Sequence, residues 1–566
     1  EVDNKEKTLT ISDNGIGMNE EDLKSSLGTI ARSGTKAFLE QISKSNKDKK
    51  TDMSMIGQFG VGFYASFMVA DDVEVISKKA GDSQAWKWSS DGKTGFNLVK
   101  AEKDNFGTSI LLKLKTDAKE FLEETRLQFI VRKYSDHISY PVKLSQKDKK
   151  DSEIKTLNEA SALWTRPAKE IKDEQYQEFF SHIGAGFGKP LLTMHNNTEG
   201  TISYTNLICI PSTRPFDLFN PDRKSSLKLY INRVFITDKC DALIPSYLRF
   251  IKGLVDTQDI DLNVSREMLQ NNPAVAKISK SLVGKILREL KKVSEKDLDG
   301  YKNFWKEYGA VLKEGLYEDA ERKETLLDLC RFSTNESEDP ISLSQYLEKM
   351  PDTQKEIYYI SAETSAQALA SPHLEGFKSK NIPVLIMTDA IDQFWLPMVG
   401  SFKEKKFTSI TQGKINLDEL DSKNKDKKNK SNDDKDKQDK EYVDLIAQLK
   451  VVLGDQVKDI RLSSKLTDSP VCLVADEGDM DIAMEQLMAQ RDSNYKGAPR
   501  ILEINGDHSL IKNMKSLLSK KESNDLVSDA GTLLFEQARL MEGKMPADPA
   551  QFSKIMNQFL LKAIPN

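Results

Sequence analysis

Hydrophobic and polar positions follow two different periods in the first quarter of the chain. Alternation with a period of two predicts strands, and apolar positions three or four residues apart predict amphipathic helices. The predicted strands cover 8–11, 72–77 and 109–114, and the predicted helices cover 19–27, 62–69 and 118–134. Strands interleaved with helices are typical of an α/β domain.

The remainder of the chain mixes the same two patterns. Strands are predicted within "LKLYINRVFI" (227–236), at 357–361 and 382–388, and near 458–462 and 500–504. Helices are predicted over 273–330, 441–453, 526–541 and 549–563. The fold class predicted for the whole chain is therefore α/β and α+β, spread over several domains.

The length of the chain and one charged run indicate how it divides. A chain of 566 residues is too long for one hydrophobic core, so about three domains are expected. The run "DSKNKDKKNKSNDDKDKQDK" (421–440) contains no hydrophobic residue and is predicted to be a solvated linker or loop. A second break falls near 145–152. The predicted domains are 1–145, 150–417 and 441–566, with a charged linker at 418–440.

The composition argues against several classes of protein. Charged residues make up 30% and hydrophobic residues 38%, and no apolar run is long enough to span a membrane. Lys and Arg number 83 against 88 Asp and Glu, and this net charge of -5 disfavours a protein that mainly binds nucleic acid. The four cysteines form no CxxC pair, which favours reduced, buried thiols. We expect a cytoplasmic protein that binds neither nucleic acid nor membrane.

The segment "SDNGIGM" (12–18) combines one carboxylate with bare backbone at the end of a predicted strand. Gly15 and Gly17 follow Asp13, so a planar base could come close while Asp13 accepts hydrogen bonds from an exocyclic amine. Taken alone, the same residues also fit an ordinary hairpin turn.

Two further segments extend this pattern. "GQFGVGFY" (57–64) places three glycines ahead of a predicted helix, where backbone N–H groups can face phosphate. "NFGTSILLKL" (105–114) places Thr108 at the mouth of a strand, where its hydroxyl could share the base with Asp13. A glycine-rich turn and a strand-capping threonine are the ordinary alternatives. Neither a GxxxxGK[ST] loop nor a GxGxxG fingerprint is present.

Together and in this order, these segments resemble the GHKL ATPase superfamily and, more closely, its ninety-kilodalton heat-shock chaperone family. The motifs that carry the resemblance are "DNGIGM", "LGTIARSGTKAF", "GQFGVGFY", "LWTR", "LKLYINRVFI" and "LNVSREMLQ". They cover nearly the whole chain. The short passage through 145–152 and the ending "LLKAIPN" are similar to the bacterial form of the family.

The resemblance implies both a fold and a cofactor. The implied fold is a GHKL two-layer α/β sandwich, incomplete at its start, then an αβα middle domain with a catalytic Arg loop and a client surface. An α+β C-terminal dimerisation domain completes it. The implied cofactors are ATP and Mg²⁺.

The resemblance also assigns residues to the nucleotide. Asp13 would hold the adenine amine, and residues 27–36 would form a lid over bound ATP. The other implied contacts are Gly17, Met18 and Thr108 around the base, Leu27 in the lid, Arg32 near the phosphates, and the backbone of Gly60, Val61, Gly62 and Phe63 on the triphosphate.

Arg266, in "DLNVSREMLQ" (261–270), falls at the start of a predicted helix, where a cation opposes the helix dipole. From the residues alone, pairing with a nearby carboxylate such as Asp259, Asp261 or Glu267 would explain it. The resemblance implies instead that Arg266 reaches the γ-phosphate when the domains dock. It also implies that Gln270 helps to position the same loop.

In the family, a general-base Glu and a Mg²⁺-binding Asn lie on a helix ahead of the first glycine segment. No residue precedes Glu1 here that could belong to that helix. Glu20 and Glu21 instead look like first-turn acids of a helix capped by Asn19. We therefore expect the parent protein to be an ATPase and this chain alone to hydrolyse almost no ATP.

Two surfaces are expected to meet partner proteins. The resemblance implies that apolar residues contact unfolded or partly folded clients, and the candidates are Trp164, Phe216, Leu218, Phe219, Met480, Met484, Leu487 and Met488. From the residues alone, the helical spacing of the last four is more typical of a core face. The helices over 526–541 and 549–563 could complete their own core, but the resemblance favours a four-helix junction in a homodimer. An Hsp70-type chaperone is a further implied partner. The histidines show no metal-ligand spacing, so no metal site is expected and His137 is predicted to be structural.

The sequence therefore predicts an ATP-dependent molecular chaperone that remodels clients through an open and closed dimer cycle. One alternative is a GHKL-type DNA topoisomerase or mismatch-repair ATPase, which would need a basic surface that faces DNA. The other is an ATP-independent holding chaperone, in which only client binding remains.

Overall fold

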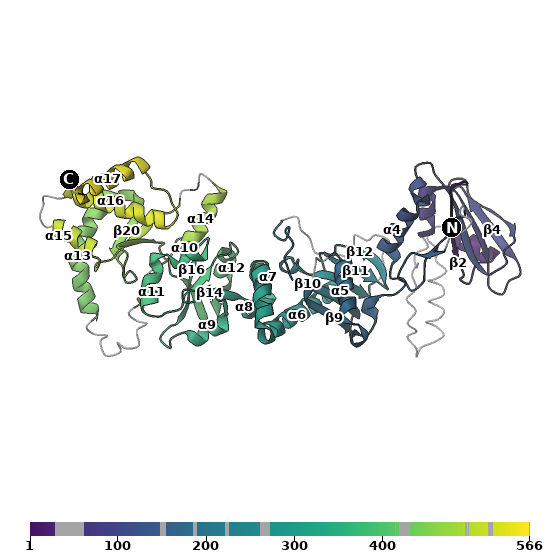
Figure 1. Cartoon of the computed structure of the whole chain (residues 1–566), viewed down its shortest axis with the longest axis horizontal. Coiled ribbons are helices and arrows are strands. Elements are labelled where there is room, and N and C mark those ends of the chain that lie inside the picture. Colours follow the sequence, from purple (N-terminus) through teal and green to yellow (C-terminus); the bar gives the residue numbers. More distant parts are fainter. Residues whose placement is uncertain are drawn as a thin grey trace. The chain divides into compact units, whose positions relative to one another are not determined.

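The structure is a computed structural model, and its elements carry the labels of Figure 1. It describes residues 1–28, 62–147, 154–184, 189–220, 226–260, 272–413, 415–417, 431–492, 495, 497–518 and 524–564, without the side chains of 226 and 431–440. The chain divides into two compact units, Glu1–Lys285 and Ile286–Asn566. Each unit is described by itself. The domain boundaries predicted at 145, 417 and 440 stay predictions.

The first sheet of unit 1 is antiparallel throughout, with the strand order β1-β2-β6-β3-β4-β5. Its strands are β1 (Val2–Asp3), β2 (Thr8–Asp13), β3 (Ala70–Lys78), β4 (Ala85–Ser90), β5 (Asn97–Ala101) and β6 (Gly107–Leu114). The strands predicted in this part of the chain are confirmed, because each predicted range lies within β2, β3 or β6.

Short helices pack on one face of this sheet. They are α1 (Glu20–Leu27), the 3₁₀ turn η1 (Gly62–Ala65) and α3 (Ser66–Val69). Leu23 of α1 and Phe63 of η1 share a hydrophobic cluster with Val73, Val75 and Trp88. The predicted helix over 62–69 is thus a 3₁₀ turn followed by one α-helical turn.

The start of α1 agrees with its predicted cap. The Asn19 side chain accepts a hydrogen bond from the backbone of Asp22, and the Asp22 side chain accepts one from the backbone of Asn19. Glu20 and Glu21 occupy the first turn, where their charges complement the positive end of the helix. The prediction that they are first-turn acids is therefore confirmed.

Unit 1 continues through η2 (Lys119–Leu122) and α4 (Glu124–Ser135), which share the predicted helix over 118–134. A small hairpin follows, and then a second sheet. These elements are β7 (Lys143–Leu144), β8 (Lys155–Thr156), η3 (Leu163–Thr165), η4 (Ala168–Glu170), α5 (Asp173–His182), β9 (Pro190–Thr198), β10 (Tyr204–Pro211), β11 (Ser226–Ile231), β12 (Val234–Thr237), η5 (Ser246–Leu248) and β13 (Lys252–Thr257).

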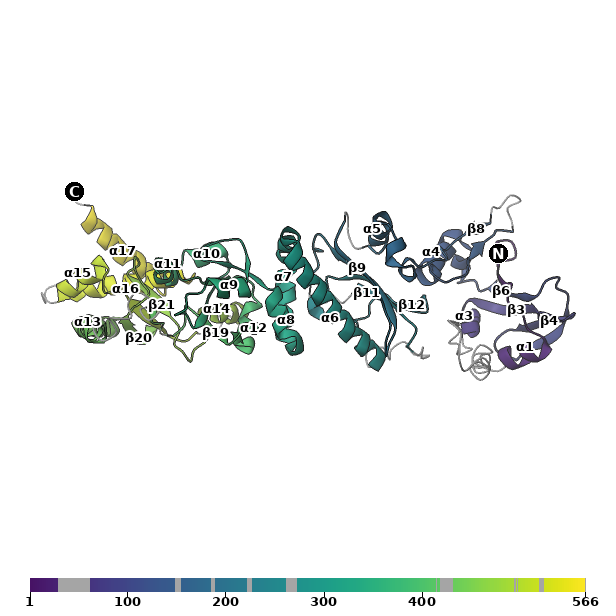
Figure 2. The same ribbon diagram turned by 90° about the horizontal axis from the view of Figure 1, so that it is seen from below.

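The second sheet has the order β12-β11-β13-β10-β9 and helices on both faces. On one face, Tyr176 and Phe179 of α5 pack against the cluster that contains Leu207 of β10. On the other, Tyr204 of β10 donates from its hydroxyl to Ser281 Oγ of α6 (Pro273–Lys296) at 2.9 Å. Figure 2 shows α6 running across this sheet. The three layers agree with the predicted αβα middle domain.

Unit 2 contains a mixed sheet with the order β15-β14-β17-β16-β19-β18. Its elements are α7 (Leu298–Glu318), η7 (Ala320–Arg322), α8 (Lys323–Leu329), β14 (Arg331–Thr334), β15 (Ile341–Ser342), α9 (Leu343–Lys349), β16 (Glu356–Ser361), α10 (Ser365–Leu369), η8 (Pro372–Leu374), α11 (Glu375–Ser379), β17 (Leu385–Met387), α12 (Asp392–Val399), β18 (Ser401–Phe402) and β19 (Lys405–Ser409). Both strands predicted here, over 357–361 and 382–388, are confirmed, the second only in its central part.

A buried ion pair joins α7 to α12. Lys313 Nζ donates to both carboxylate oxygens of Asp392, at 2.6 and 2.8 Å, and lies 2.6 Å from Asp389. Trp395 Nε1 also donates to Asp392, at 2.7 Å. Burial opposes the charge of Lys313, but Asp392 and Asp389 together raise its pKa. The lysine therefore stays charged inside the unit.

A three-stranded sheet with the order β20-β22-β21 forms the last part of unit 2. Its elements are α13 (Ser431–Leu453), η11 (Gly454–Gln456), β20 (Val457–Leu462), β21 (Val471–Val474), α14 (Ile482–Arg491), β22 (Arg500–Ile504), α15 (Ser509–Leu518), α16 (Asn524–Met541) and α17 (Pro549–Ala563). Helices α13, α15 and α16 contribute to one hydrophobic cluster with these strands. An α+β domain was expected here.

Two expectations need correction. The charged run over 421–440 was predicted to be a linker or loop, but α13 begins at Ser431, because the run contains neither Pro nor Gly to interrupt a helix. Trp164 and Leu218 were expected to be exposed, but they are 1% and 0% exposed. Trp164 Nε1 donates to Asp256 at 2.8 Å inside the second sheet. Trp164 and Leu218 therefore belong to the core.

The buried state predicted for the four cysteines is confirmed.

Glu542 lies directly after α16 with its side chain 8% exposed, and neither of its carboxylate oxygens has a hydrogen-bond partner. Lys544 Nζ lies 3.6 Å from Oε2. Burial raises the pKa of Glu542 to about 7, against the opposing effects of Lys544 and Arg500. The folded chain therefore keeps a proton on Glu542 at pH values where the unfolded chain has lost it.

We expect Glu542→Gln to stabilise the protein above about pH 7 and to change little near pH 4.5. Because the folded pKa exceeds the unfolded one, the contribution of Glu542 is complete below about pH 4.5 and is lost as the pH rises through about 7. The shift from 4.5 to about 7 corresponds to about 3 kcal/mol.

Differential scanning calorimetry between about pH 5 and pH 8 measures this difference. Glu477→Gln, at an exposed position after β21, is the matched control and should leave the pH dependence unchanged. Parallel melting curves for wild type and Glu542→Gln across this range would contradict the prediction.

Candidate nucleotide-binding site

Asp13 and Thr108 lie side by side at one end of the first sheet, because β2 and β6 pair them directly. Asp13 Oδ1 accepts hydrogen bonds from the backbone N–H of Gly15 at 2.9 Å and of Thr108 at 3.3 Å. These bonds fix the orientation of the exposed carboxylate. Among the described residues no hydrogen bond reaches Asp13 Oδ2, so this oxygen can accept one from an exocyclic amine.

Ser77 of β3 is paired with Thr108 on the other side of β6 from Asp13, and it is fully buried. Its Oγ is 2.9 Å from Thr108 Oγ1 and accepts a hydrogen bond from the backbone N–H of Met18 at 2.8 Å. One buried hydroxyl therefore joins the threonine to the glycine segment that follows β2. Ser77 was not predicted from the sequence. The available signal was a small polar residue on the inward-facing register of β3, where the other members are Ala70, Val73 and Val75.

Gly17 is required by the path of the chain. Its φ is +67°, and a Cβ atom there would lie 1.9 Å from the carbonyl oxygen of Lys78. The backbone of the glycine segment thus lies directly against the end of β3. Gly107 has φ +117° and a similar approach to the carbonyl oxygen of Asp13, at 2.3 Å from its hypothetical Cβ. Both glycines allow the backbone to pack closely around Asp13.

Three further predicted contacts lie in the described part of the site. Met18, Leu27 and Phe63 are partly buried in the cluster on the face of the first sheet. The Leu27 carbonyl accepts a hydrogen bond from Tyr64 at 3.0 Å, which links the end of α1 to η1.

Of the remaining predicted site residues, one lies in the described part of the chain and the others lie outside it. Gly62 is exposed at the first position of η1. Arg32, Gly60, Val61, Arg266 and Gln270 lie outside the described residues, so their predicted roles stay predictions.

Comparison with known proteins identifies the family. The profile described as "Hsp90 protein" matches residues 145–565, and the one described as "Histidine kinase-, DNA gyrase B-, and HSP90-like ATPase" matches residues 1–108. The chain belongs to the Hsp90 family. Among curated proteins it is similar to "Chaperone protein HtpG" of Roseobacter denitrificans, with 47% identity over 100% of the chain and 89% of the relative. The HtpG proteins of Rhodospirillum rubrum and Orientia tsutsugamushi are 44% and 42% identical over the same shares.

Membership of the Hsp90 family confirms several expectations. The chain is a heat-shock chaperone of the GHKL ATPase class, with the mixed α/β fold that was predicted. The family implies nucleotide and Mg²⁺ use, client proteins and a homodimer. Within the described ranges, no helix combines the length and the apolar character needed to cross a membrane.

We expect Gly17→Ala to destabilise the first sheet and to weaken nucleotide binding. The added methyl group would meet the Lys78 carbonyl oxygen, so the turn must shift in addition to adopting a strained φ. Gly81→Ala is the matched control, because Gly81 also has a positive φ of +91° but has no atom within 4 Å of the place that a methyl group would take.

Thermal unfolding measures the loss of folding stability in both variants. Gly81→Ala should lose about 1–2 kcal/mol through backbone strain alone. Gly17→Ala should lose about 1–3 kcal/mol more, because its methyl group also meets the Lys78 carbonyl. Equal losses at the two positions would show that the close approach at Lys78 has no energetic consequence.

Proposed function

We propose that this Hsp90-family protein is an ATP-dependent chaperone that binds unfolded or partly folded proteins and remodels them through an ATP-driven open and closed dimer cycle. The observation that supports ATP as the ligand is the arrangement of Asp13, Thr108 and Gly17. A carboxylate oxygen without a described partner, a hydroxyl and bare backbone meet at one sheet end.

This arrangement favours adenine over guanine. The exocyclic amine of adenine is a donor that suits the Asp13 carboxylate, whereas guanine presents a carbonyl oxygen at the same position of the ring. Mg²⁺, which accompanies ATP, would neutralise part of the phosphate charge when bound.

The proposed phosphate contacts come from the other predicted residues. Arg32 in the lid and the backbone from Gly60 to Phe63 would hold the triphosphate. Arg266 would stabilise the charge that develops on the γ-phosphate, with Gln270 positioning its loop, and an arginine in this role contributes about 10³–10⁵ in rate. Hydrolysis would then depend on a segment far along the chain from Asp13.

Exposed apolar side chains support client binding. Phe216 is 103% exposed and Phe219 is 49% exposed in the segment after β10, where the Arg214 guanidinium lies over the Phe219 ring at 5.8 Å from its centroid. On α14, the residues turned inward are Ile482 and Glu485, so Met484, Leu487 and Met488 remain partly exposed. Flexible methionine side chains suit a surface that adapts to different partners.

The apolar face of α17 supports a homodimer. Ile555 is 5% exposed and points into its own unit. Four other apolar side chains, on α17 and directly after it, are 40–77% exposed. They are Met556, Leu560, Leu561 and Ile564. An apolar face this broad is typical of a helix that packs against the same helix of a second chain.

We expect Asp13→Asn to weaken ATP binding by about tenfold or more in the full-length gene product. A hydrogen bond to a charged group contributes about 1.5–3 kcal/mol. Asn presents either its NH₂ group, which cannot accept a hydrogen bond, or a neutral carbonyl oxygen, which accepts more weakly than a carboxylate. Isothermal titration calorimetry measures the affinity, and Asp82→Asn in the turn after β3 is the matched control.

Unchanged affinity in Asp13→Asn would contradict the assignment of this site to adenine. Suppression of client aggregation by the wild-type protein, measured with and without ATP, tests the rest of the proposal. Equal protection under both conditions would favour an ATP-independent holding chaperone.

We expect the double substitution Leu560→Asp and Leu561→Asp to separate the dimer into monomers. Two buried charges at the interface would lack partners, while neither side chain contributes to the core of its own unit. Analytical ultracentrifugation measures the mass, with Gln551→Asp and Gln558→Asp on the same helix as the charge-matched control. A double variant that stays dimeric would place the interface elsewhere.

A further inference from the structure

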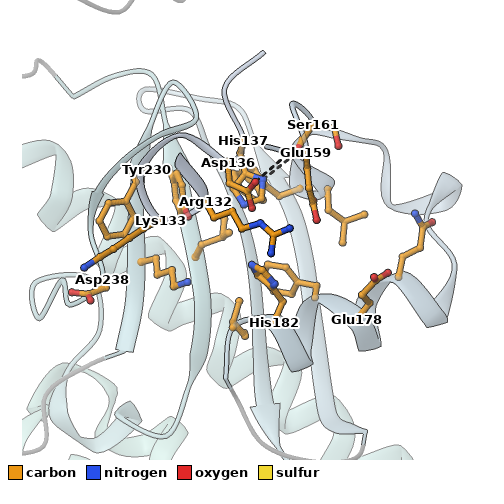
Figure 3. Close-up of a pocket in the computed structure, with 18 of the residues that line it drawn as sticks. Arg132, Lys133, Asp136, His137, Glu159, Ser161, Glu178, His182, Tyr230 and Asp238 are labelled. Carbon is orange, nitrogen blue, oxygen red and sulfur yellow. Dashed lines mark hydrogen bonds between the residues drawn. The ribbon is translucent and has the colours of Figure 1, made fainter. Parts of the chain in front are cut away.

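Unit 1 contains a cavity of about 450 Å³ that shares no residue with the nucleotide site. Its walls come from α4, the segment that follows β8, α5 and the second sheet. Figure 3 shows three side chains gathered on one side of this cavity, Asp136, His137 and Glu159, with His182 and Glu178 on the opposite side.

The three gathered side chains offer one metal-ligand atom each. A carboxylate oxygen of Asp136, a ring nitrogen of His137 and a carboxylate oxygen of Glu159 all lie within 4.8 Å of one another. Asp136 is buried, His137 is partly buried and Glu159 is exposed at the mouth. The cluster is therefore open to solvent through its third member.

The fold fixes the orientation of two members. Asp136 Oδ1 accepts a hydrogen bond from the backbone N–H of Glu159 at 3.1 Å. His137 Nδ1 lies 3.0 Å from the carbonyl oxygen of Ser161, and its ring packs edge-on to Trp164 at 4.5 Å between centroids. Because a carbonyl oxygen only accepts, Nδ1 is the donor in this contact. Histidines that bind metals are oriented by this kind of contact to a backbone carbonyl.

The charges around the cluster point to a bound cation. Two carboxylates lie close together, and within the described ranges no ion pair of 4.0 Å or less joins Asp136 or Glu159 to a Lys, Arg or His. The cations that line the same cavity are Arg132, Lys133, Arg166 and Lys228. The carboxylates of Asp136, Glu159, Glu178 and Asp238 line it as well, so the two signs of charge balance in number, and none of the four cations forms an ion pair with Asp136 or Glu159 among the described residues. A cation held between the carboxylates of Asp136 and Glu159 would be attracted by both of them.

We infer that Asp136, His137 and Glu159 form a binding site for a divalent transition-metal ion, with Zn²⁺ as the representative of the class. One imidazole nitrogen with two carboxylate oxygens suits Zn²⁺, Mn²⁺, Co²⁺ or Ni²⁺ better than the all-oxygen shells of Ca²⁺ and Mg²⁺. Donors of a tetrahedral Zn²⁺ lie about 3.4 Å apart, so the three atoms must approach by up to about 1.4 Å. Rotation of the exposed Glu159 side chain supplies that movement, and water from the cavity completes the shell.

This site was not expected from the sequence, which predicted a structural role for His137. Asp136 and His137 are adjacent, but Glu159 reaches them only because the segment after β8 folds back over the end of α4, where the Ala160 N–H donates to the Asp136 carbonyl at 3.1 Å. The spacing of Asp136, His137 and Glu159 along the chain does not indicate that contact.

Two measurements on the full-length protein test the site. Isothermal titration calorimetry with ZnCl₂ gives the affinity, and quenching of Trp164 fluorescence by Co²⁺ reports a metal beside His137. Trp164→Phe identifies the part of the signal that comes from this residue. Asp136→Asn, His137→Gln and Glu159→Gln should each weaken binding by about tenfold or more.

Glu178→Gln and His182→Gln, which line the same cavity away from the cluster, are the matched controls and should change the affinity less than about threefold. Glu159 is exposed, so Glu159→Gln tests the site even if the Asp136 variant fails to fold. Zn²⁺ affinity equal to wild type in Glu159→Gln, or no Trp164-dependent quenching by Co²⁺, would overturn the inference. Neither result depends on ATP binding.

Discussion

Strand β6 lies between β2 and β3 in the first sheet, and its antiparallel register with both decides which side chains meet at the sheet end. Thr108 is opposite Asp13 on one side and opposite Ser77 on the other. A slip of one residue would turn Thr108 to the opposite face and separate all three. The close backbone approach at Gly107 allows β6 to begin at this position without a clash against Asp13. The geometry of the nucleotide site therefore follows from strand pairing.

The local parts of this geometry could be predicted from the sequence. Alternation located β2, β3 and β6, and the Asn19 cap followed by acids located the start of α1, because these features depend on residues a few positions apart. Asp13 and Thr108 were first linked by their predicted places at strand ends, and the family resemblance then assigned both to the base. Ser77 was not linked to them, because a small polar residue on the inward-facing register of β3 indicates burial but not which groups of β6 and of the glycine segment it contacts.

The non-local parts could not be predicted. Trp164 follows a predicted break in the chain and looked like an exposed aromatic residue, but its indole N–H reaches Asp256 on β13 and its ring lies 5.0 Å from that of Tyr230. Helical spacing on α14 suggested a methionine stripe, yet the residues turned inward are Ile482 and Glu485. Periodicity locates a face of a helix, whereas only tertiary contacts decide which face is covered.

The buried charges of unit 2 show the same dependence on precise partners. Glu485 is buried, and its carboxylate accepts hydrogen bonds from Arg500 at 2.6 Å and from the Ala498 N–H at 2.9 Å. The Glu542 side chain is 8% exposed, and its carboxylate accepts no hydrogen bond among the described residues and has Lys544 Nζ at 3.6 Å. Desolvation opposes both charges, and only close contacts offset it. The two glutamates therefore differ in the contacts that the fold gives their carboxylates, and sequence alone could not distinguish them, because the Arg500 guanidinium and the Ala498 N–H reach Glu485 only through the tertiary fold.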